Sequence, residues 1–275
     1  MMIKSRNFKN KTLLVSGAII GLLLAAVICA PALAPYNPLA ICLDTAKLPP
    51  GGGHLFGTDT LGRDILSRVL WGGRVSLLIG VAATLVSLGV GLVIGLMAGY
   101  FGGKIDVAFT VIMDLFLAFP SLLLAIGISV IIPPGLLATV IALGAVGWAS
   151  FARLFRGLAL SFRENVFIDA SRAIGCSHLR IIAVHILPQC SPLALIAASL
   201  KVGGFILAES ALSFLGLGVQ PPDPTWGSMV SQYRNYLPSA PWMVIFPGGA
   251  IALTVLAFNL FGDALRDRLD PKLKL

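Results

Sequence analysis

The residues able to perform chemistry are few in this chain, and their spacing matches no catalytic or metal-binding pattern. The four cysteines form no CxxC pair and the three histidines form no HExxH motif, so neither a metal site nor a disulfide framework is indicated. Gly103-Lys104 resembles part of a phosphate-binding loop, but Ala98 and Ile105 occupy two positions that this motif fixes. No nucleophile stands beside an evident base. We therefore predict a chain that is not an enzyme, binds no cofactor and has no nucleotide site of its own.

Three charged residues, Asp114, Lys201 and Glu209, lie inside long apolar segments. Charges in such positions are costly in a membrane and usually face a cavity or a polar partner. Each residue either has a structural role, held by backbone or by another helix, or lines a path for a solute. Lys201 and Glu209 would be separated on one helix by about 12 Å along the axis and roughly 80° around it. We expect that these two do not pair directly, and that Asp114 stands alone at its depth.

The segments that carry these residues are predicted to cross a membrane. The chain is 57% hydrophobic and 12% charged, whereas soluble domains are about 25% charged. Residues 12–43, 75–103 and 235–262 contain no charge at all. A membrane-spanning helix needs about 20 apolar residues, and long runs without alternation favour helices over strands. We predict an all-α polytopic membrane protein, and we attribute the net charge of +8 to membrane topology rather than to nucleic-acid binding.

Six spans fit this pattern, and Pro133-Pro134-Gly135 separates the third from the fourth because such a turn cannot continue a helix. The first apolar segment resembles a secretory signal peptide that ends in Ala32-Leu33-Ala34. Its apolar run exceeds the usual length of about 7–15 residues, and Pro35 would directly follow the cut, so we expect an uncleaved span. The predicted spans are residues 12–34, 75–101, 107–132, 136–160, 192–217 and 241–262.

Lysine and arginine predict the orientation, because they are enriched in cytoplasmic loops. With six spans, both chain ends, residues 102–106 and residues 153–188 share one side and carry 14 of the 20 basic residues. We expect this side to be the cytoplasm. The chain then divides into residues 1–74, with the cytoplasmic tail, the first span and an outer loop, and residues 75–275, a core of five spans with a cytoplasmic loop at about 162–190.

That loop contains the sequence IDASRAIGCSHLRIIAVHILPQ, residues 168–189, which is too polar to cross a membrane. Its pattern predicts two short helices with a bend. Asp169 suits a first helical turn, and Gly175 allows a turn or a close backbone approach. Pro188 and Pro192 are predicted to end the second helix and to open the fifth span. The loop either lies on anionic lipid as a linker or docks into a groove on a partner protein.

Several of these residues resemble the motif EAA-x3-G-x9-I-x-L-P of importer permeases of the ATP-binding cassette class. Asp169-Ala170-Ser171 is followed by Gly175 and then by Leu187-Pro188, at the spacing of the motif. The departures are Asp for Glu, Ser for the second Ala, and His185 in the isoleucine position. In the family this loop is the coupling helix that contacts the ATPase. The resemblance implies that role for Asp169, Ala170, Ser171, Arg172, Gly175, Leu187 and Pro188.

Further segments resemble the dipeptide, oligopeptide and nickel permeases of this class over nearly the whole chain. They are FGTDTLGRDILSRVLWGGRVSLLIG (56–80), GYFGGKID (99–106), DLFLAFPSLLLAI (114–126), SFLGLGVQPPDPTWG (213–227) and NLFGDALRDRLDP (259–271). The resemblance implies a type I importer permease fold with six transmembrane helices, in the inner (plasma) membrane, working by alternating access. It also implies a homologous second permease subunit, one or two ATPase subunits that hold ATP and Mg, and an extracytoplasmic solute-binding protein.

Di- and oligopeptides are the cargo that the resemblance implies first, and nickel or a nickel chelate is the alternative. In either case Asp114, Lys201 and Glu209 are candidates to line the path and to contact the charged ends of a peptide or a charged chelate. A secondary transporter, which would need ion-coupling groups near the middle of the membrane, is a distant alternative because only these three residues qualify.

The start of the second span is also charged. Asp64 and Arg68 are spaced as an i,i+4 pair, with Arg63 and Arg74 close by. This region is either a solvated helix start near the lipid headgroups or part of an outer platform for the binding protein.

The second span contains a doubled GxxxG pattern at Gly91, Gly95 and Gly99. Glycines at this spacing let two helix backbones approach closely. The contact is expected either within the subunit or against the partner permease, and the sequence does not distinguish the two.

Overall fold

The computed structural model describes residues 2–269, and the surroundings of side chains from residue 11 onward. This part of the chain is helical, with two isolated bridges and no β-strand, which confirms the predicted all-α class. A π-helical turn, Ile181–Ile186, joins α8 to α9, and short 3-10 turns lie at Leu43–Thr45 and Arg234–Tyr236. The α-helices are α1 (Met2–Ile28), α2 (Ala30–Leu33), α3 (Ile65–Phe101), α4 (Gly103–Ala118), α5 (Ser121–Ile131), α6 (Leu136–Arg163), α7 (Val166–Ala173), α8 (His178–Arg180), α9 (Leu187–Phe214), α10 (Trp226–Tyr233) and α11 (Trp242–Leu269).

Within the described residues, five helical segments are long and apolar enough to cross a membrane, and the bent pair α4–α5 makes a sixth. The number of spans therefore agrees with the prediction when that pair is counted as one span. The basic residues of the tail at positions 4–9, and those beyond residue 269, lie outside the part of the chain whose side chains are described.

Helix α3 begins ten residues before the predicted second span. The Asp64 carboxylate caps this helix by accepting a hydrogen bond from the backbone N–H of Ser67 at 2.7 Å. Such a cap stabilises a helix start by satisfying an N–H group that has no partner within the helix. The prediction placed the start too late because it excluded the arginines that follow Asp64.

The third predicted span, residues 107–132, is not one helix. It breaks between α4 and α5, whose axes differ by 91°. Pro120 has no N–H to donate, and Phe119 before it is extended, with φ −93° and ψ 144°. The break is therefore a consequence of Pro120, which the prediction of a continuous span overlooked. The first span is likewise interrupted, because α1 ends at Ile28 and a short α2 follows.

The doubled GxxxG pattern packs within the subunit, where α3 lies against α6. A Cβ atom at Gly91 would lie 2.7 Å from the carbonyl oxygen of Trp148, and one at Gly99 would lie 2.6 Å from that of Arg156. Gly95 is equally close to the backbone of α6. Glycine is therefore required at these positions by a close approach of two backbones, which is the function that the spacing predicts.

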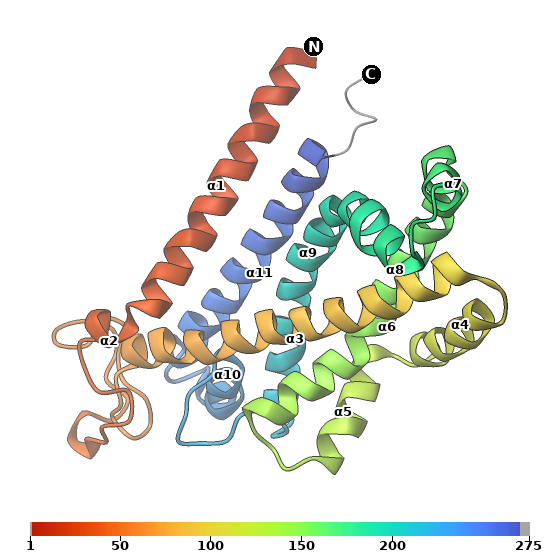
Figure 1. Cartoon of the computed structure of the whole chain (residues 1–275). Helices are drawn as coiled ribbons and strands as arrows, with labels where there is room; N and C mark the ends of the chain where they lie inside the picture. The colour runs from red at the N-terminus through yellow and green to blue at the C-terminus, as the bar shows by residue number, and fades with distance from the viewer. Residues whose placement is uncertain (1, 270–275) are drawn as a thin grey trace.

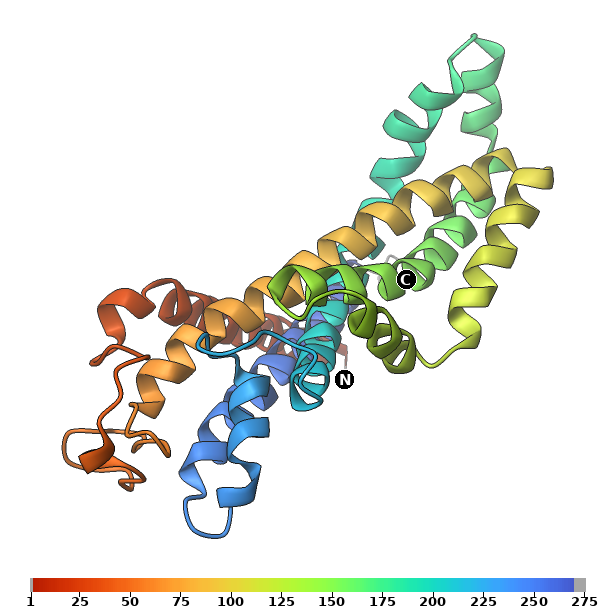
Figure 2. The same cartoon turned by 90° about the horizontal axis from the view of Figure 1, so that it is seen from below.

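Figures 1 and 2 show how the helices are arranged around α3. Helix α3 runs from the region of α1 and α2 to the region of α7 and α8. Helices α1 and α11 run side by side in opposite directions, and Figure 1 shows the start of α1, the end of α11 and α7 towards one end of the molecule. Helices α2, α5 and α10 lie towards the other end. The start of α1 and the end of α11 therefore lie on the same side as the polar loop, as the predicted grouping requires.

Candidate functional site

Helices α7 and α8 and the π-helical turn form a hairpin, residues 166–186. It projects beside the C-terminal end of α3, the end that lies away from α1 (Figure 2). Gly175 turns the chain with φ +81°, a conformation that L-amino acids other than glycine rarely adopt. A Cβ atom there would meet nothing within 4 Å, so the backbone conformation alone requires glycine. Asp169 lies in the first turn of α7. The predicted bend between two short helices is confirmed.

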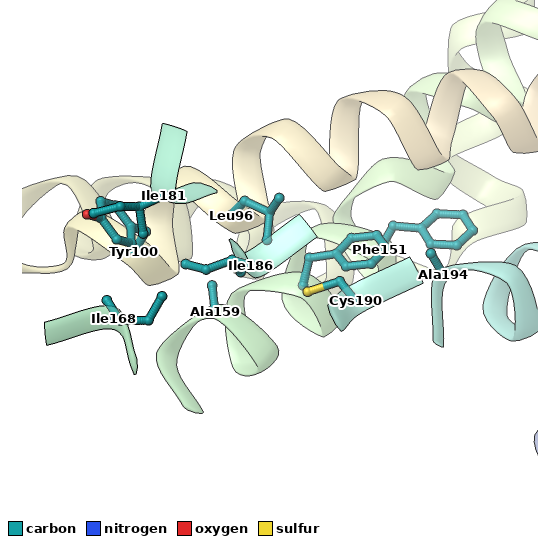
Figure 3. Packing of buried hydrophobic residues seen from close by; sticks show 10 residues of the cluster. Leu96, Tyr100, Phe151, Ala159, Ile168, Ile181, Ile186, Cys190 and Ala194 are labelled. Carbon is teal, nitrogen blue, oxygen red and sulfur yellow. The ribbon is translucent and has the colours of Figure 1, made fainter. Parts of the chain in front are cut away.

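One face of α7 is buried and the other is open. Ile168 is 0% exposed and packs in a cluster with Ile181 and Ile186 from the returning arm of the hairpin. Figure 3 shows this cluster, which also includes Tyr100 of α3 and Ala159 of α6. Interiors of this kind are close-packed and transmit strain. Buried side chains of the hairpin therefore share one cluster with side chains of α3 and α6.

The open face carries part of the predicted coupling set. Asp169, Ala170 and Arg172 are exposed, whereas Ser171 is buried and donates a 2.7 Å hydrogen bond to the carbonyl oxygen of Phe167. Large apolar side chains are also exposed on this hairpin: Val166 is 84% exposed, Ile174 82% and Leu179 78%. Exposed apolar side chains that gather on one element commonly mark a contact with another protein.

Aromatic and charged side chains attach the hairpin to the end of α3. The hydroxyl of Tyr100 lies 2.8 Å from Nδ1 of His178, and the guanidinium of Arg172 lies 5.4 Å from the centre of the Tyr100 ring. Arg172 also pairs with Asp169 at 3.1 Å. A cavity of about 560 Å³ lies beside these groups. Sequence reasoning missed Tyr100 and His178, because their contact joins residues 78 positions apart and no local spacing indicates it.

Pro188 stands in the first turn of α9 and so opens the fifth span as predicted, but Pro188 and Pro192 do not end the helical path before it, contrary to the prediction. The chain passes from α8 through the π-helical turn into α9, which contains both prolines. Pro188 lacks the N–H group that an α-helix would donate to Val184, and the wider turn accommodates this loss. The N–H of Leu187 bonds instead to the carbonyl of Ile182, five residues back. Leu187 packs against the buried cluster and Pro188 is exposed.

Asp114 is not alone at its depth, which corrects the prediction. Arg153 of α6 forms an ion pair and a hydrogen bond with it, and Arg156 one turn further pairs with Asp106 in the same way. The prediction failed because it counted both arginines with the cytoplasmic stretch 153–188, although the predicted span 136–160 also contains them. The side chains of Asp114 and Arg153 are each 56% exposed. Since lipid cannot solvate such a pair, this face of α4 and α6 is expected to meet water or protein.

Lys201 faces a cavity of about 450 Å³ enclosed by the α4–α5 bend, α6 and α9. Its Nζ lies 5.7 Å from the centre of the Phe205 ring. Apart from Lys201, the residues lining this cavity are uncharged: Phe116, Leu117, Phe119, Ser121, Leu122, Ala125, Leu143, Val146, Gly147, Ser150, Gly204, Phe205 and Ala208.

Glu209 is 0% exposed, and its carboxylate is held by one hydroxyl of its own helix and one of α3. It accepts hydrogen bonds from the hydroxyls of Ser213, at 2.7 Å, and Ser76 of α3, at 3.4 Å. The Ser76 oxygen in turn accepts the backbone N–H of Trp226, in the first turn of α10, at 3.2 Å. This geometry favours the structural alternative for Glu209. Lys201 and Glu209 contact different groups, as their separation predicted.

A buried polar network lies at the end of the molecule that carries α2 and α10. Asp59 binds Nε of Arg63 at 2.6 Å and accepts a 2.7 Å hydrogen bond from Tyr233. Burial raises the pKa of the Tyr233 hydroxyl, which keeps it protonated as a donor. Nε of Arg68 lies 3.8 Å from the same carboxylate. The two loops on this side are therefore tied together by ionic and hydrogen-bonding contacts.

This network corrects the predictions made for the start of the second span. Asp64 does not pair with Arg68: it caps α3 and lies 2.9 Å from Nδ1 of His54. Asp64 and Arg68 are 2% and 3% exposed, so the solvated helix start is wrong. The role of this region as a platform for a partner stays a prediction.

The fold and these sites define a polytopic helical membrane protein whose charged groups are arranged along helices rather than around a reacting centre. The chain belongs to the family of binding-protein-dependent transport system inner membrane components, whose family model matches residues 91–275. A second model, the N-terminal TM domain of oligopeptide transport permease C, matches residues 4–50. The chain is thus a membrane-spanning permease subunit of an ATP-binding cassette importer, as the resemblance implied.

Known relatives of the chain are named as peptide permeases. The di/tripeptide transport system permease protein DppC of Pseudomonas aeruginosa (strain UCBPP-PA14) is 45% identical over 269 residues, which cover 94% of this chain and 89% of that protein. The oligopeptide transport system permease protein OppC of Bacillus subtilis (strain 168) is 40% identical over 265 residues, 96% and 87% of the two chains. The glutathione transport system permease protein GsiD of Pectobacterium atrosepticum is 40% identical, covering 98% of this chain and 90% of that protein.

Among solved structures, the chain is similar in fold to inward facing conformations of the MetNI methionine ABC transporter. The TM-score is 0.62 at 19% identity, and the match covers 75% of this chain and 98% of the other. This likeness supports the type I importer permease fold that the resemblance implied.

Proposed function

We propose that this subunit forms, with a homologous second permease subunit, the translocation path for di- and oligopeptides. An extracytoplasmic solute-binding protein delivers the peptide, and one or two ATPase subunits that hold ATP and Mg drive the cycle. The names of several relatives that are 40–45% identical support peptides as the cargo. Among the described residues no group of three His, Cys, Asp or Glu could hold a metal ion, so no observation favours nickel over peptides.

The hairpin of residues 166–186 is the observation that carries the proposed mechanism. Its open face presents Asp169, Ala170 and Arg172, and its opposite face buries Ile168 against α3 and α6. A force applied to the open face is therefore passed to the spanning helices through close-packed contacts. We propose that the ATPase closes on this hairpin and that α3 and α6 convert the push into opening of the path toward the outside.

This proposal places the hairpin and both chain ends in the cytoplasm. The excess of Lys and Arg on that side supports the orientation. The buried network of Asp59, Arg63 and Tyr233 then lies at the outer surface. There it holds the two outer loops together, as a platform for the binding protein would require.

The test uses the complete transporter in proteoliposomes, with a labelled dipeptide loaded on the binding protein. Gly175→Val is expected to abolish ATP-driven uptake while the subunit still inserts and assembles. The substitution forces a β-branched residue into φ +81°, where an L residue costs about 1–2 kcal/mol, and distorts the docking surface without a clash inside the chain.

Gly21→Val is the matched control, since a Cβ atom at Gly21 in α1 also meets nothing within 4 Å but its φ lies outside the left-handed region. It is expected to transport normally. The Gly175→Val transporter could instead take up peptide at the wild-type rate, with ATP hydrolysis still stimulated by the loaded binding protein. That result would show that the hairpin does not couple ATP hydrolysis to peptide uptake. Uptake of nickel and not of peptide by the wild type would overturn the cargo assignment.

A further inference from the structure

The cavity beside Lys201 contains the positive charge of this lysine, and no acidic residue is among its lining residues. Lys201 lies near the middle of α9 (Leu187–Phe214), and the other residues lining the cavity are uncharged. Within the described residues, no carboxylate comes within ion-pair distance of Lys201, and its recorded contact is with the Phe205 ring. A lysine at this depth without a counter-charge is costly, so a purely structural role does not explain it.

The two acidic residues predicted, like Lys201, to lie inside spans already have polar partners. Asp114 pairs with Arg153, and Glu209 accepts hydrogen bonds from Ser213 and Ser76. Neither lines the cavity. An anion that neutralises Lys201 therefore has to arrive from outside this part of the chain.

The cavity can receive a small molecule. Its volume of about 450 Å³ falls within the range of about 300–1,000 Å³ that is usual for small-molecule sites. Gly204 leaves open space, since a Cβ atom there would meet nothing within 4 Å. The bend at Pro120 also turns α5 away from the line of α4, and residues on both sides of this bend line the cavity.

Building on the proposed function, we infer that Lys201 binds the C-terminal carboxylate of the peptide as it passes through the path. Every linear peptide has this group whatever its side chains, so a single cation recognises the whole cargo class. The apolar walls accept varied side chains, and the low local dielectric strengthens the pairing of ammonium and carboxylate. The absence of an acid from the lining disfavours the peptide's amino end at the same place.

The inference is tested with the complete transporter in proteoliposomes, using a labelled dipeptide and the same dipeptide with a C-terminal amide. Each peptide is supplied at a concentration that saturates the binding protein, so that selection at the permease step is measured. Lys201→Met is expected to lower uptake of the free acid by on the order of tenfold, the worth of one charge-assisted contact. Uptake of the amide is expected to change little, so the acid-to-amide ratio falls. Lys201→Arg is expected to restore the ratio.

Lys47→Met is the matched control, because it also removes a lysine that lies over an aromatic ring, at 4.6 Å from Tyr236, but outside the cavity. It is expected to leave the ratio unchanged. An unchanged acid-to-amide ratio in Lys201→Met would overturn the inference. The same conclusion would follow if uptake of both peptides and the ATP hydrolysis stimulated by the binding protein all fell equally. Failure of the proposed function is seen separately, in a wild-type transporter that hydrolyses ATP but takes up neither peptide.

Discussion

Glu209 and Lys201 are about two turns apart on α9, and the groups around them determine what each can do. Glu209 is fully buried and joins three helices, because Ser76 of α3 contacts both its carboxylate and the backbone of α10. Lys201 faces a cavity without a counter-charge. The sequence identified both residues by their cost in a membrane, but it left their roles open, since the distinction depends on contacts with other helices.

Replacing Glu209 separates its hydrogen-bonding role from its charge. Glu209→Leu is expected to destabilise the subunit, because the hydroxyls of Ser76 and Ser213 lose a buried acceptor at a cost of about 1–3 kcal/mol per group. Glu209→Gln keeps an acceptor of the same shape and is expected to lose much less. Thermal unfolding of the purified subunit in detergent measures both changes. Equal melting temperatures for the two variants would contradict the structural role.

At the scale of elements, the most extensive helix contact in the described part of the chain is the packing of α3 against α6. The spacing of Gly91, Gly95 and Gly99 predicted a close helix approach, and the structure identifies α6 as the partner. Other features of elements were missed. Pro120 breaks the third span by 91°, and Pro188 is accommodated by a π-helical turn instead of ending a helix. Prolines have local signals, but whether a helix bends or ends depends on its neighbours.

Two glycines of α3 offer a matched pair for testing this contact. Gly95→Val is expected to lower the melting temperature, because its Cβ atom would lie 2.9 Å from that of Phe155 and closer still to the backbone of α6. Overpacking of this kind costs about 1–3 kcal/mol. Gly89→Val places the same side chain on the same helix where nothing lies within 4 Å, and it is expected to be tolerated. Equal effects of the two substitutions would show that α3 and α6 do not pack as described.

At the scale of the whole molecule, the class, the number of spans and the grouping of the hairpin with both chain ends followed from composition, uncharged runs and basic residues. The contacts through which the proposed coupling would act did not follow from these features. The pairs Tyr100–His178 and Asp114–Arg153 join distant parts of the chain, and no periodicity marks them. These contacts connect the hairpin to α3 and connect α4 to α6, so motion of the hairpin is expected to move several spans together.

The account depends most on the contact between the hairpin and a separate ATPase, and cysteine crosslinking tests it directly. Cys29, Cys42, Cys176 and Cys190 are first replaced, and a single cysteine is introduced at Ala170 or, as a control at the other end of the molecule, at exposed Ser239. Ala170→Cys in the assembled transporter is expected to crosslink to the ATPase subunit, with a yield that changes when ATP binds, whereas Ser239→Cys is not. A hairpin cysteine that crosslinks to no other polypeptide in a transporter active in uptake would contradict the account.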